Sequence, residues 1–476
     1  MIPRGDTDLP FDTVLVANRG EIALRVVRTC RELGLRTVVV YSTADRDSAA
    51  VRAADRSVYI GPSTVRRSYL FAPAIIEAAR QTGAQAIHPG YGFLSEDPDF
   101  AEICADNGLV FVGPRPELMS RLGDKAQARS LLAEAGMPLL PGSLGTVDNA
   151  AEAVELASEI GFPLIIKAVA GGGGRGMTIV WDGDDLVPAY HATRATAQTT
   201  FGDGRVYVER YCPQARHVEV QVLADEHGTV LHLGERDCSV QRRHQKLIEE
   251  TPAPRLPEAV RKRLTGAAVR GAEAVGYTGA GTFEFLVDGD DCYFMEVNCR
   301  IQVEHPVTEM VTGIDLVREQ LHIAAGRPLR FTQAEIEPRG VAIECRVNAE
   351  DPNRDFAPTA GSLTEFVPPG GPFVRVDTHA RTGWSVPVEY DSLLAKVVAW
   401  APDRALAIER MRRALDEFRI AGSGVRTTAR YLSELLDDSS FRAGTHTTRF
   451  LEHRARAHRD EERGHESTAT VGRRRT

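Results

Sequence analysis

The chain is too long for a single domain and carries a net negative charge. Its 476 residues exceed what one hydrophobic core usually holds, so about three domains are expected. The net charge of −9 at pH 7 disfavours nucleic acid and anionic membranes as main partners, and we expect neither. No run approaches the roughly 18 apolar residues of a membrane span, and the first residues lack the apolar core of a signal peptide, which predicts a cytoplasmic protein. The seven cysteines lie singly, which argues against a disulfide framework and against a zinc site.

Residues 13–112 alternate apolar runs with amphipathic ones, which is typical of a parallel sheet covered by helices on both faces. The first strand-to-helix turn, residues 17–21, has one glycine instead of the G-x-G-x-x-G that a dinucleotide pyrophosphate needs. We therefore expect a Rossmann-like topology without an NAD site. The loop HPGYGF at 88–93 follows a strand end and is either a ligand loop or a rigid structural loop.

Lysine is rare in this chain, which makes each lysine a candidate for function. Of the 57 basic residues, the five lysines are Lys125, Lys167, Lys246, Lys262 and Lys396. In a chain so rich in arginine, lysine is expected mainly where a compact ammonium serves better than a planar guanidinium. Composition alone therefore nominates these five positions.

Two of these lysines lie beside backbone that attracts anions. Asp124 caps a predicted helix, so Lys125 lies at a helix N-terminus. Lys167 lies in the apolar strand PLIIKA, which leads into the glycine-rich segment at 171–176. Because β-type residues follow this segment, we interpret it as a mobile flap between two strands, whose N–H groups close over phosphates. A merely flexible hairpin tip is the alternative.

The middle of the chain predicts strands and a polar loop. His217, Glu219 and Gln221 alternate with apolar residues and share one face of a predicted strand. Residues 235–250 have too few apolar side chains for either a helix or a strand period, so we expect a structured polar loop. Its cationic side chains form either a ligand site or a solvated surface.

Residues 282–298 predict a β-hairpin with two facing glutamates. The Asp-Gly-Asp-Asp sequence at 288–291 is turn chemistry, and it places Glu284 opposite Glu296 with Cβ atoms about 5 Å apart. Two like charges at this distance repel unless a cation lies between them. Together with the Asn298 amide they offer only hard oxygens, which predicts Mg²⁺ shared with substrate phosphates. An acidic hairpin whose carboxylates point into water is the alternative.

The last third of the chain contains a linker, a mixed region and a polar tail. Residues 326–339 predict a linker with two prolines. An alternating strand follows at 341–348, with Glu344 and Arg346 on one face, and a helix is predicted at 404–418. From about residue 453 the chain is too polar to bury anything and is predicted to be disordered.

Taken together, these stretches resemble biotin carboxylases, the ATP-grasp components of biotin-dependent acetyl-CoA, acyl-CoA and pyruvate carboxylases. The likeness covers roughly residues 11–452, and the family's motifs occur in order: ANRGEIALR, HPGYGFLSE, GDKAQAR, IIKAVAGGGGRGM, RHVEVQV, ERDCSVQRRHQK, GTFEFL, EVNCRIQVEHPVTE, ECRVNAEDP and YDSLLAK. Other ATP-grasp ligases share the flap and the carboxylate hairpin but lack RIQVEHPVTE, QRRHQK and ECRVNAED. As a set, the motifs are therefore specific to this family.

The resemblance implies an α/β (α+β) fold in three domains. We expect a Rossmann-like domain at 11–120, an ATP-grasp domain at 121–325 and a mixed β/α C-terminal domain at 340–452. The glycine-rich lid of the ATP-grasp domain would span about 140–211, and a disordered tail would occupy 453–476.

The resemblance also implies a ligase reaction. ATP phosphorylates bicarbonate to carboxyphosphate, and the carboxyl group passes to N1 of biotin; the implied cofactor is Mg²⁺ or Mn²⁺. No lysine has the Met-flanked signature of a biotinylated residue, so we expect biotin on a separate biotin carboxyl carrier protein. A carboxyltransferase subunit, a homodimer and a role in fatty acid biosynthesis are also implied.

Three alternatives to an acetyl- or acyl-CoA carboxylase subunit stay open. The chain is also compatible with the corresponding subunit of a pyruvate carboxylase, or with another bicarbonate-phosphorylating ATP-grasp ligase. From a different class, it would be an inactive scaffold that binds a carrier protein.

Matching positions in the family assign roles to individual residues. Lys246 and Arg300 are implied to hold bicarbonate and the transferred phosphoryl group, Glu304 to take the bicarbonate proton, and Arg346 to stabilise the biotin enolate. The implied bicarbonate and biotin site comprises Tyr91, Arg300, Gln302, Val303, Glu304 and Arg346. The implied nucleotide ligands are Lys125, Lys167, Gly172, Gly173, Gly174, Glu209, His217, Gln241 and His244, and the implied metal ligands are Glu284, Glu296 and Asn298.

The segment that follows the predicted metal site is expected to leave the sheet. Polar residues alternate from Glu296 to Glu304, which is the pattern of an extended chain. However, a base that must reach a substrate other than ATP is easier to place on a loop, and Pro306 cannot extend a ladder. Cys299, beside Arg300, would be a site of inhibitory thiol modification if it were exposed.

Overall fold

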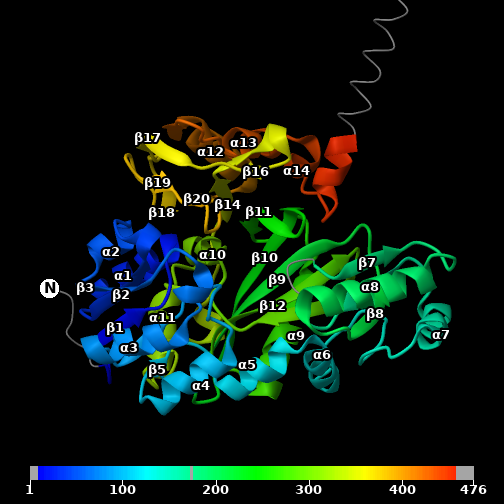
Figure 1. Ribbon diagram of the computed structural model, residues 1–476. Coiled ribbons are helices and arrows are strands. Elements are labelled where there is room, and N and C mark those ends of the chain that lie inside the picture. The colour runs from blue at the N-terminus through cyan, green and yellow to red at the C-terminus, as the bar shows by residue number, and fades with distance from the viewer. Residues whose placement is uncertain (1–8, 172–174, 457–476) are drawn as a thin grey trace, which may run out of the picture.

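The computed structural model of the chain describes residues 9–171 and 175–456. Its N-terminal part is a sheet of five parallel strands in the order β3-β2-β1-β4-β5, drawn in dark to light blue in Figure 1. This arrangement confirms the parallel sheet predicted for residues 13–112. The strands are β1 (Thr13–Val16), β2 (Arg36–Ser42), β3 (Arg56–Gly61), β4 (Ala86–His88) and β5 (Val110–Phe111). The helices are α1 (Gly20–Glu32), α2 (Ala49–Ala53), α3 (Ala72–Thr82) and α4 (Pro98–Asp106), with short 3₁₀ turns at Thr43–Asp45 and Val65–Arg67.

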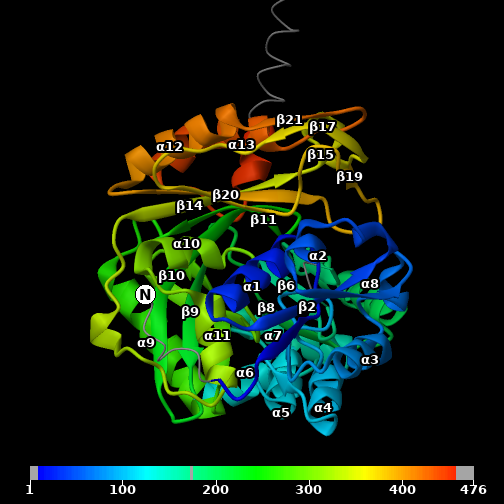
Figure 2. The same ribbon diagram turned by 90° about the vertical axis from the view of Figure 1, so that its left-hand side faces the viewer.

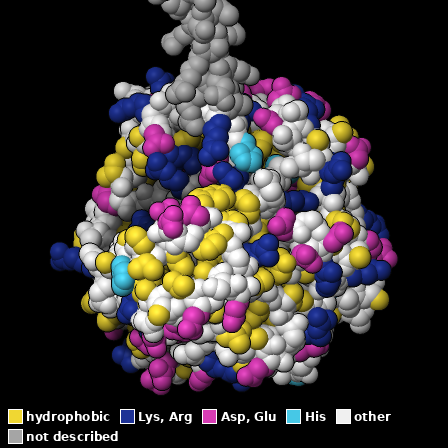
Figure 3. Space-filling model, turned by 90° about the vertical axis from the view of Figure 1, so that its right-hand side faces the viewer, with side chains coloured by type: hydrophobic (Ala, Val, Ile, Leu, Met, Phe, Trp, Pro, Cys, Tyr) yellow, Lys and Arg dark blue, Asp and Glu magenta, His cyan; other side chains and the backbone are white. Residues whose placement is uncertain are grey.

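A small antiparallel sheet, in the order β7-β6-β8, carries the segment predicted to be a flap. β6 pairs antiparallel with β7, so the glycine-rich segment joins two strands as predicted, although Gly172, Gly173 and Gly174 lie outside the described residues. The elements of this region are α7 (Ala150–Ile160), β6 (Leu164–Ala168), β7 (Met177–Val180), α8 (Leu186–Phe201) and β8 (Val206–Arg210). Figure 3 shows apolar side chains gathered on the face that carries these elements.

An eight-stranded antiparallel sheet runs through the rest of the molecule in the order β13-β12-β9-β10-β11-β14-β20-β18. It contains strands from both the predicted ATP-grasp part and the predicted C-terminal part, because β11 pairs directly with β14. The strands are β9 (Arg216–Ala224), β10 (Val230–Arg242), β11 (Gln245–Thr251), β12 (Gly279–Asp288), β13 (Asp291–Asn298), β14 (Val341–Asn348), β18 (Val374–Thr378) and β20 (Leu393–Ala401). The accompanying helices are α5 (Pro116–Gly123), α6 (Lys125–Glu134), α9 (Glu258–Val275), α10 (His305–Thr312) and α11 (Leu316–Ala324).

The prediction of a polar loop at 235–250 is wrong. The segment forms the end of β10 and most of β11, joined by a tight turn at Arg243 and His244, both of which have positive φ. Glu235, Arg236 and Asp237 are buried in β10 although they are charged. The period of apolar residues fails here because ionic and hydrogen-bonded partners from other segments, instead of apolar contacts, satisfy these buried side chains.

The C-terminal part lies across the top of the molecule in Figures 1 and 2. Its core packs α12 and α13 against β14 and β20, through residues such as Ile343, Val397 and Met411. The remaining elements are β15 (Glu350–Asp351), β16 (Ala357–Pro358), β17 (Gly361–Val367), β19 (Ser385–Val386), α12 (Arg404–Glu417), β21 (Arg419–Gly422), α13 (Ala429–Leu436) and α14 (Ser439–Ala443), with 3₁₀ turns at Gln333–Glu335 and Pro352–Arg354. Residues 450–456 are helical, so the first residues of the predicted disordered tail are ordered, and 457–476 lie outside the described residues. Among the described helices, none combines the length and the apolar character needed to span a membrane.

Candidate active site

One face of the eight-stranded sheet carries a row of charged side chains. Glu296 on β13 is paired in register with Glu284 on β12, which is paired with Glu219 on β9, which is paired with Arg236 on β10. Residues at paired positions point to the same face of a sheet. The predicted juxtaposition of Glu284 and Glu296 is thus confirmed, and it extends into a ladder of four charged residues.

Two β-bulges bring residues onto this face. Phe285 pairs with Phe294 whereas Glu284 pairs with Glu296, so Met295 is an extra residue on β13. The extra residue reverses the alternation, because without it Glu296 would lie on the same side as the buried Phe294. In the same way, Val240 pairs with Ile248 whereas Gln241 pairs with Lys246, a shift that turns Lys246 away from the core side. The bulges therefore aim two of the predicted site residues.

Lys246 lies at the centre of the charged face. Its Nζ is 2.7 Å from a carboxylate oxygen of Glu219, 3.1 Å from one of Glu284 and 2.7 Å from one of Glu304. Although burial disfavours its charged form, the surrounding acidic groups raise the pKa of Lys246 well above its usual range. Lys246 therefore stays protonated and offsets the repulsion among three buried carboxylates.

Glu304 lies between Lys246 and Arg346. β13 ends at Asn298, residues 299–304 form a loop, and Glu304 immediately precedes α10, so the expected departure from the sheet is confirmed. Pro306 lies in the first turn of α10, where its missing N–H is tolerated. One carboxylate oxygen of Glu304 accepts from Lys246 and the other accepts from Nη2 of Arg346 at 2.7 Å. Burial alone would raise the pKa of Glu304, but these two cations and Arg236 hold it well below its usual range.

Arg300 connects the loop of residues 299–304 to the N-terminal part and to the β12–β13 hairpin, which carries the predicted metal ligands. Its Nε donates to Glu96 at 2.8 Å, and its two terminal nitrogens donate to Gln302 at 2.8 Å and to Asn298 at 3.1 Å. The amides of Gln302 and Asn298 in turn donate to Glu284, at 3.3 Å and 2.8 Å. These contacts place the predicted phosphate, bicarbonate and metal residues in one connected network.

Models of known protein families match the chain in three consecutive parts. Residues 10–119 match the family described as biotin carboxylase, N-terminal domain, residues 124–332 match the carbamoyl-phosphate synthase L chain, ATP binding domain, and residues 344–453 match the biotin carboxylase C-terminal domain. The biotin carboxylase of Nostoc sp. is 51% identical over 445 residues, which are 93% of this chain and 99% of the relative.

The chain belongs to the biotin carboxylase family. It is an ATP-dependent ligase with the three-domain fold of that family. Solved structures agree: a biotin carboxylase complex from Campylobacter jejuni has a TM-score of 0.90 at 48% identity, covering 93% of this chain and 99% of the other. The biotin carboxylase domain dimer of a Hydrogenobacter thermophilus 2-oxoglutarate carboxylase, bound to MgADP, ADP and bicarbonate, has a TM-score of 0.89 at 45% identity, covering 93% and 97%.

The lysines predicted to bind the nucleotide phosphates each form an ion pair with a carboxylate. Lys125 contacts Glu296 at 2.7 Å, and Lys167 contacts Glu209 at 2.5 Å. Arg129 donates to the second oxygen of Glu209. Burial opposes ionisation of Glu209, but these two cations lower its pKa below the usual range. The carboxylates therefore hold both lysine ammoniums in place.

The histidines assigned to the nucleotide side lie at different depths. His217 is buried on β9, with its Nε2 2.8 Å from a carboxylate oxygen of Glu284. Burial favours the neutral ring, but Glu284 raises the pKa of His217 above its usual value. His244 is exposed in the turn between β10 and β11, where desolvation by its surroundings lowers its pKa and the charges of Lys167 and His217 lower it further. Gln241 is the second-last residue of β10, paired with Lys246 on β11.

The donor atoms of the hairpin fit a hard divalent cation. Glu284 and Glu296 are carboxylates at paired register positions, and Asn298 adds an amide in contact with Glu284. Lys246 and Lys125 each contact one of these carboxylates, and Lys246 is shared with Glu219 and Glu304. Oxygen donors of this kind suit Mg²⁺.

Several residues of this network were not assigned a role from the sequence. Arg129, Glu249 and Glu96 each contact a predicted site residue. Arg236 contacts Glu219, which in turn contacts Lys246. Arg129 and Glu96 occur in motifs that mark the family, but a buried charge has no periodic signature that separates it from a surface charge. Their partners come from distant segments, so burial was the missing information.

Tyr91 and Cys299 are two further residues for which the sequence predicted a role. The Tyr91 hydroxyl donates to Glu21, and its ring lies 5.9 Å from Nζ of Lys396. Cys299 is buried, with 4% of its surface exposed, and burial together with the nearby Glu96 raises the pKa of its thiol. The condition for inhibitory modification of Cys299, exposure, is therefore not met.

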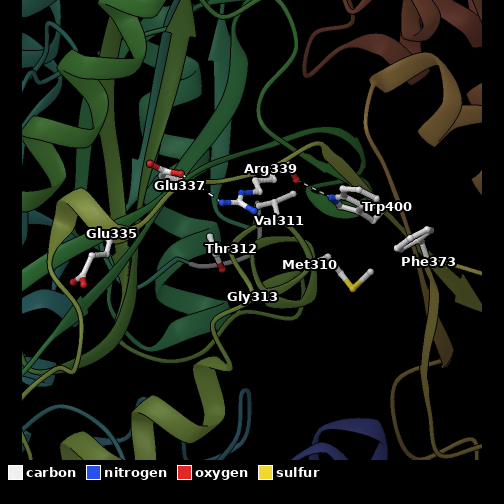
Figure 4. A pocket seen from close by; sticks show the side chains of 9 residues that line it. All are labelled: Met310, Val311, Thr312, Gly313, Glu335, Glu337, Arg339, Phe373 and Trp400. Carbon is white, nitrogen blue, oxygen red and sulfur yellow. Dashed lines mark hydrogen bonds and ion pairs between the residues drawn. The ribbon is translucent and has the colours of Figure 1, made fainter.

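The cavity shown in Figure 4 is separate from this network. It has a volume of about 410 Å³ and lies between the end of α10, the linker and β20, with Met310, Arg339, Phe373 and Trp400 among its lining residues. Trp400 donates to the backbone carbonyl of Arg339 at 2.7 Å. Its lining includes none of the residues predicted for nucleotide, metal, bicarbonate or biotin.

Proposed function

We propose that this protein transfers a carboxyl group from bicarbonate to biotin held on a separate carrier protein, as the first half-reaction of an acetyl- or acyl-CoA carboxylase. The observation that carries the proposal is the position of Glu304. It is a buried carboxylate held ionised between Lys246 and Arg346, each 2.7 Å away, and Lys246 also contacts Glu284, which is paired with Glu296. Phosphorylation of bicarbonate requires a base, cations that stabilise negative charge, and carboxylates that can hold a divalent metal ion. Glu304, the two cations and the Glu284–Glu296 pair meet these needs.

Each residue of the network has a part in this proposal. Glu304 accepts the proton of bicarbonate, and the oxygen freed of its proton attacks the γ-phosphorus of ATP, so that ADP leaves and carboxyphosphate forms. Lys246 and Arg300 stabilise the negative charge on bicarbonate and on the transferred phosphoryl group. Gln302 and Val303 line the bicarbonate site. In the second step the bond between the carboxyl carbon and the phosphate oxygen of carboxyphosphate breaks, and inorganic phosphate leaves and takes up the N1 proton of biotin. Arg346 stabilises the biotin enolate, whose N1 then forms the bond to the carboxyl carbon.

The nucleotide would lie along the sheet edge near the lid. We assign its phosphates to Lys125 and Lys167, and the adenine side to Glu209. His217, Gln241, His244 and the lid glycines Gly172, Gly173 and Gly174 complete the proposed set of nucleotide residues. Mg²⁺ or Mn²⁺, held by Glu284, Glu296 and Asn298, would neutralise phosphate charge. The structural relative that binds MgADP and bicarbonate supports these assignments.

The partners and the domain limits are part of the proposal. We infer a biotin carboxyl carrier protein and a carboxyltransferase as partners, a homodimer as the assembly and the cytoplasm as the location. A dimer in the Hydrogenobacter domain supports the homodimer. We divide the chain into domains at 11–120, 121–325 and 340–452. We assign Tyr91, in the first of these domains, to the biotin site. The final carboxyl acceptor would be chosen by the carboxyltransferase, so a pyruvate carboxylase complex is the second candidate.

Phosphate release from ATP tests the proposal. The purified protein is given ATP, Mg²⁺ and bicarbonate, with and without free biotin, and we expect biotin to stimulate the release. A rate that depends on bicarbonate but not on biotin would refute the proposal. Stimulation by ammonia instead would indicate a ligase of the carbamoyl-phosphate type, and the absence of any turnover would indicate a carrier-binding scaffold.

A further inference from the structure

Lys396 is a lysine beside the charged sheet face to which the proposed reaction assigns no role. It lies on β20, paired in register with Arg346 on β14 and with Asp377 on β18. Its side chain is fully buried, with 0% exposed. A fully buried lysine is rare unless it is paired, so its contacts indicate what it does.

Two acceptors from distant segments surround its ammonium. Nζ of Lys396 donates to the backbone carbonyl of Val303 at 2.8 Å and lies 3.0 Å from a carboxylate oxygen of Glu21 on α1. Tyr91 donates its hydroxyl to the same Glu21. Lys396 thus joins the N-terminal part, the C-terminal part and the loop that carries Glu304.

The contact with Val303 acts on the peptide that precedes Glu304. The loop of residues 299–304 is held at several other points: the N–H of Cys299 donates to Glu96 at 2.9 Å, and the carbonyl of Gln302 lies 2.7 Å from a ring nitrogen of His305. Lys396 adds a charge-assisted hydrogen bond at the last peptide before the base. Such bonds are roughly twice as strong as neutral ones and fix orientation.

We propose that Lys396 is a positioning residue, which holds the Val303 carbonyl so that the Glu304 carboxylate meets bicarbonate in the reactive orientation. The inference rests on the proposed function of Glu304. The reason for a lysine is geometric: one compact ammonium has to reach a carbonyl on one side and a carboxylate on the other inside a fully buried space. Misplacement of a catalytic group by about 1 Å can cost about 100-fold in rate.

The test compares Lys396→Met with a matched lysine variant. Methionine has a similar volume but no N–H donor and no charge. Lys262→Met is the control, because Lys262 is 76% exposed on α9 and contacts only Glu258 among the ion pairs of the described residues. For Lys396→Met we expect kcat/KM for bicarbonate to fall by about 10- to 100-fold, with the Kd for MgATP unchanged, and for Lys262→Met we expect wild-type values.

A double variant separates catalysis from stability. Lys396→Met alone leaves Glu21 buried without its cation, so the variant is expected to lose stability. Lys396→Met/Glu21→Gln removes that unpaired charge, and we expect its melting temperature to recover while its turnover with bicarbonate stays low. Recovery of turnover together with melting temperature would mean that Lys396 contributes stability only, and the proposal would fall. Failure of both variants to fold would likewise assign Lys396 a structural role.

The wild-type protein keeps this test independent of the proposed function. Biotin-stimulated phosphate release must first be measured for the wild type, and its absence would refute the proposed function. If the wild type is active and the folded double variant is equally active, only the positioning role of Lys396 is refuted.

Discussion

Replacing Glu304 by glutamine removes the proposed base with a minimal change of shape. The glutamine amide cannot accept a proton from bicarbonate, and removal of a general base typically lowers the rate by about 10²- to 10⁴-fold. We expect a loss of this size in bicarbonate-dependent phosphate release, with the Kd for MgATP changed less than about twofold, because Lys125, Lys167 and Glu209 are untouched.

The structure also bounds the effect of this variant on stability. After Glu304→Gln, Lys246 keeps Glu219 and Glu284 as partners, and Arg346 keeps Glu249 at 2.5 Å. Neither cation is left unpaired, so we expect a loss of about 1–3 kcal/mol, below the cost of an isolated buried charge. The folded-state pKa of Glu304 is lowered, so its contribution is present above the unfolded-state pKa near 4.5 and is lost as the pH falls below that value.

The assay measures phosphate release and calorimetric ATP binding in parallel. Glu273→Gln, at an exposed position on α9, is the matched control and should behave as the wild type. Normal bicarbonate-dependent turnover by a correctly folded Glu304→Gln protein would remove Glu304 from its role. A joint loss of turnover and ATP binding would instead mean that Glu304 maintains the whole site.

Three further outcomes follow from buried charges and thiols. Arg129→Met should raise the Kd for ATP about tenfold, because Glu209 loses one of its two cations, while KM for biotin stays constant; calorimetry with an unchanged Kd would contradict this. Burial raises the pKa of Glu249 to about 7, so protonated Glu249 stabilises the fold, fully below about pH 4.5. As the pH rises to 7, the free energy of unfolding should therefore fall by about 3 kcal/mol. Urea unfolding of Glu249→Gln should therefore lack this decline, and parallel pH curves for variant and wild type would refute the shift. Cys299 should resist iodoacetamide in the folded protein, which peptide mass spectrometry would show, and rapid alkylation would mean that the loop opens.

Local patterns in the sequence predicted much of the fold correctly. The alternation of apolar runs at 13–112 gave the parallel sheet, because each strand and helix there buries a continuous apolar face. The hairpin at 282–298 could be located from its turn chemistry, and its turn has Gly289 at φ +61°, with Asp288 paired to Asp291. Glu284 faces Glu296 as predicted, but only because Met295 is an extra residue on β13. Family motifs supplied the rest of the predicted site.

The tertiary structure decided which faces those residues occupy. Bulges at Met295 and beside Ile248 turn Glu296 and Lys246 to the charged face, and period-two counting cannot reveal an inserted residue. The same limit explains the error at 235–250, where buried charges such as Arg236 are satisfied by partners that are close only in the folded chain.

By itself, therefore, the sequence determined the family, the N-terminal sheet, the hairpin that carries Glu284 and Glu296, and five lysines as candidates for function. Only the tertiary structure joined β11 to β14, and with that pair it brought Lys246 and Arg346 to opposite sides of Glu304. It also gave Lys396 its partners, Val303 and Glu21, from segments more than 90 residues away. The physical reason is that periodicity and turns are local, whereas pairing of buried charges depends on contacts between distant strands, which only the folded sheet defines.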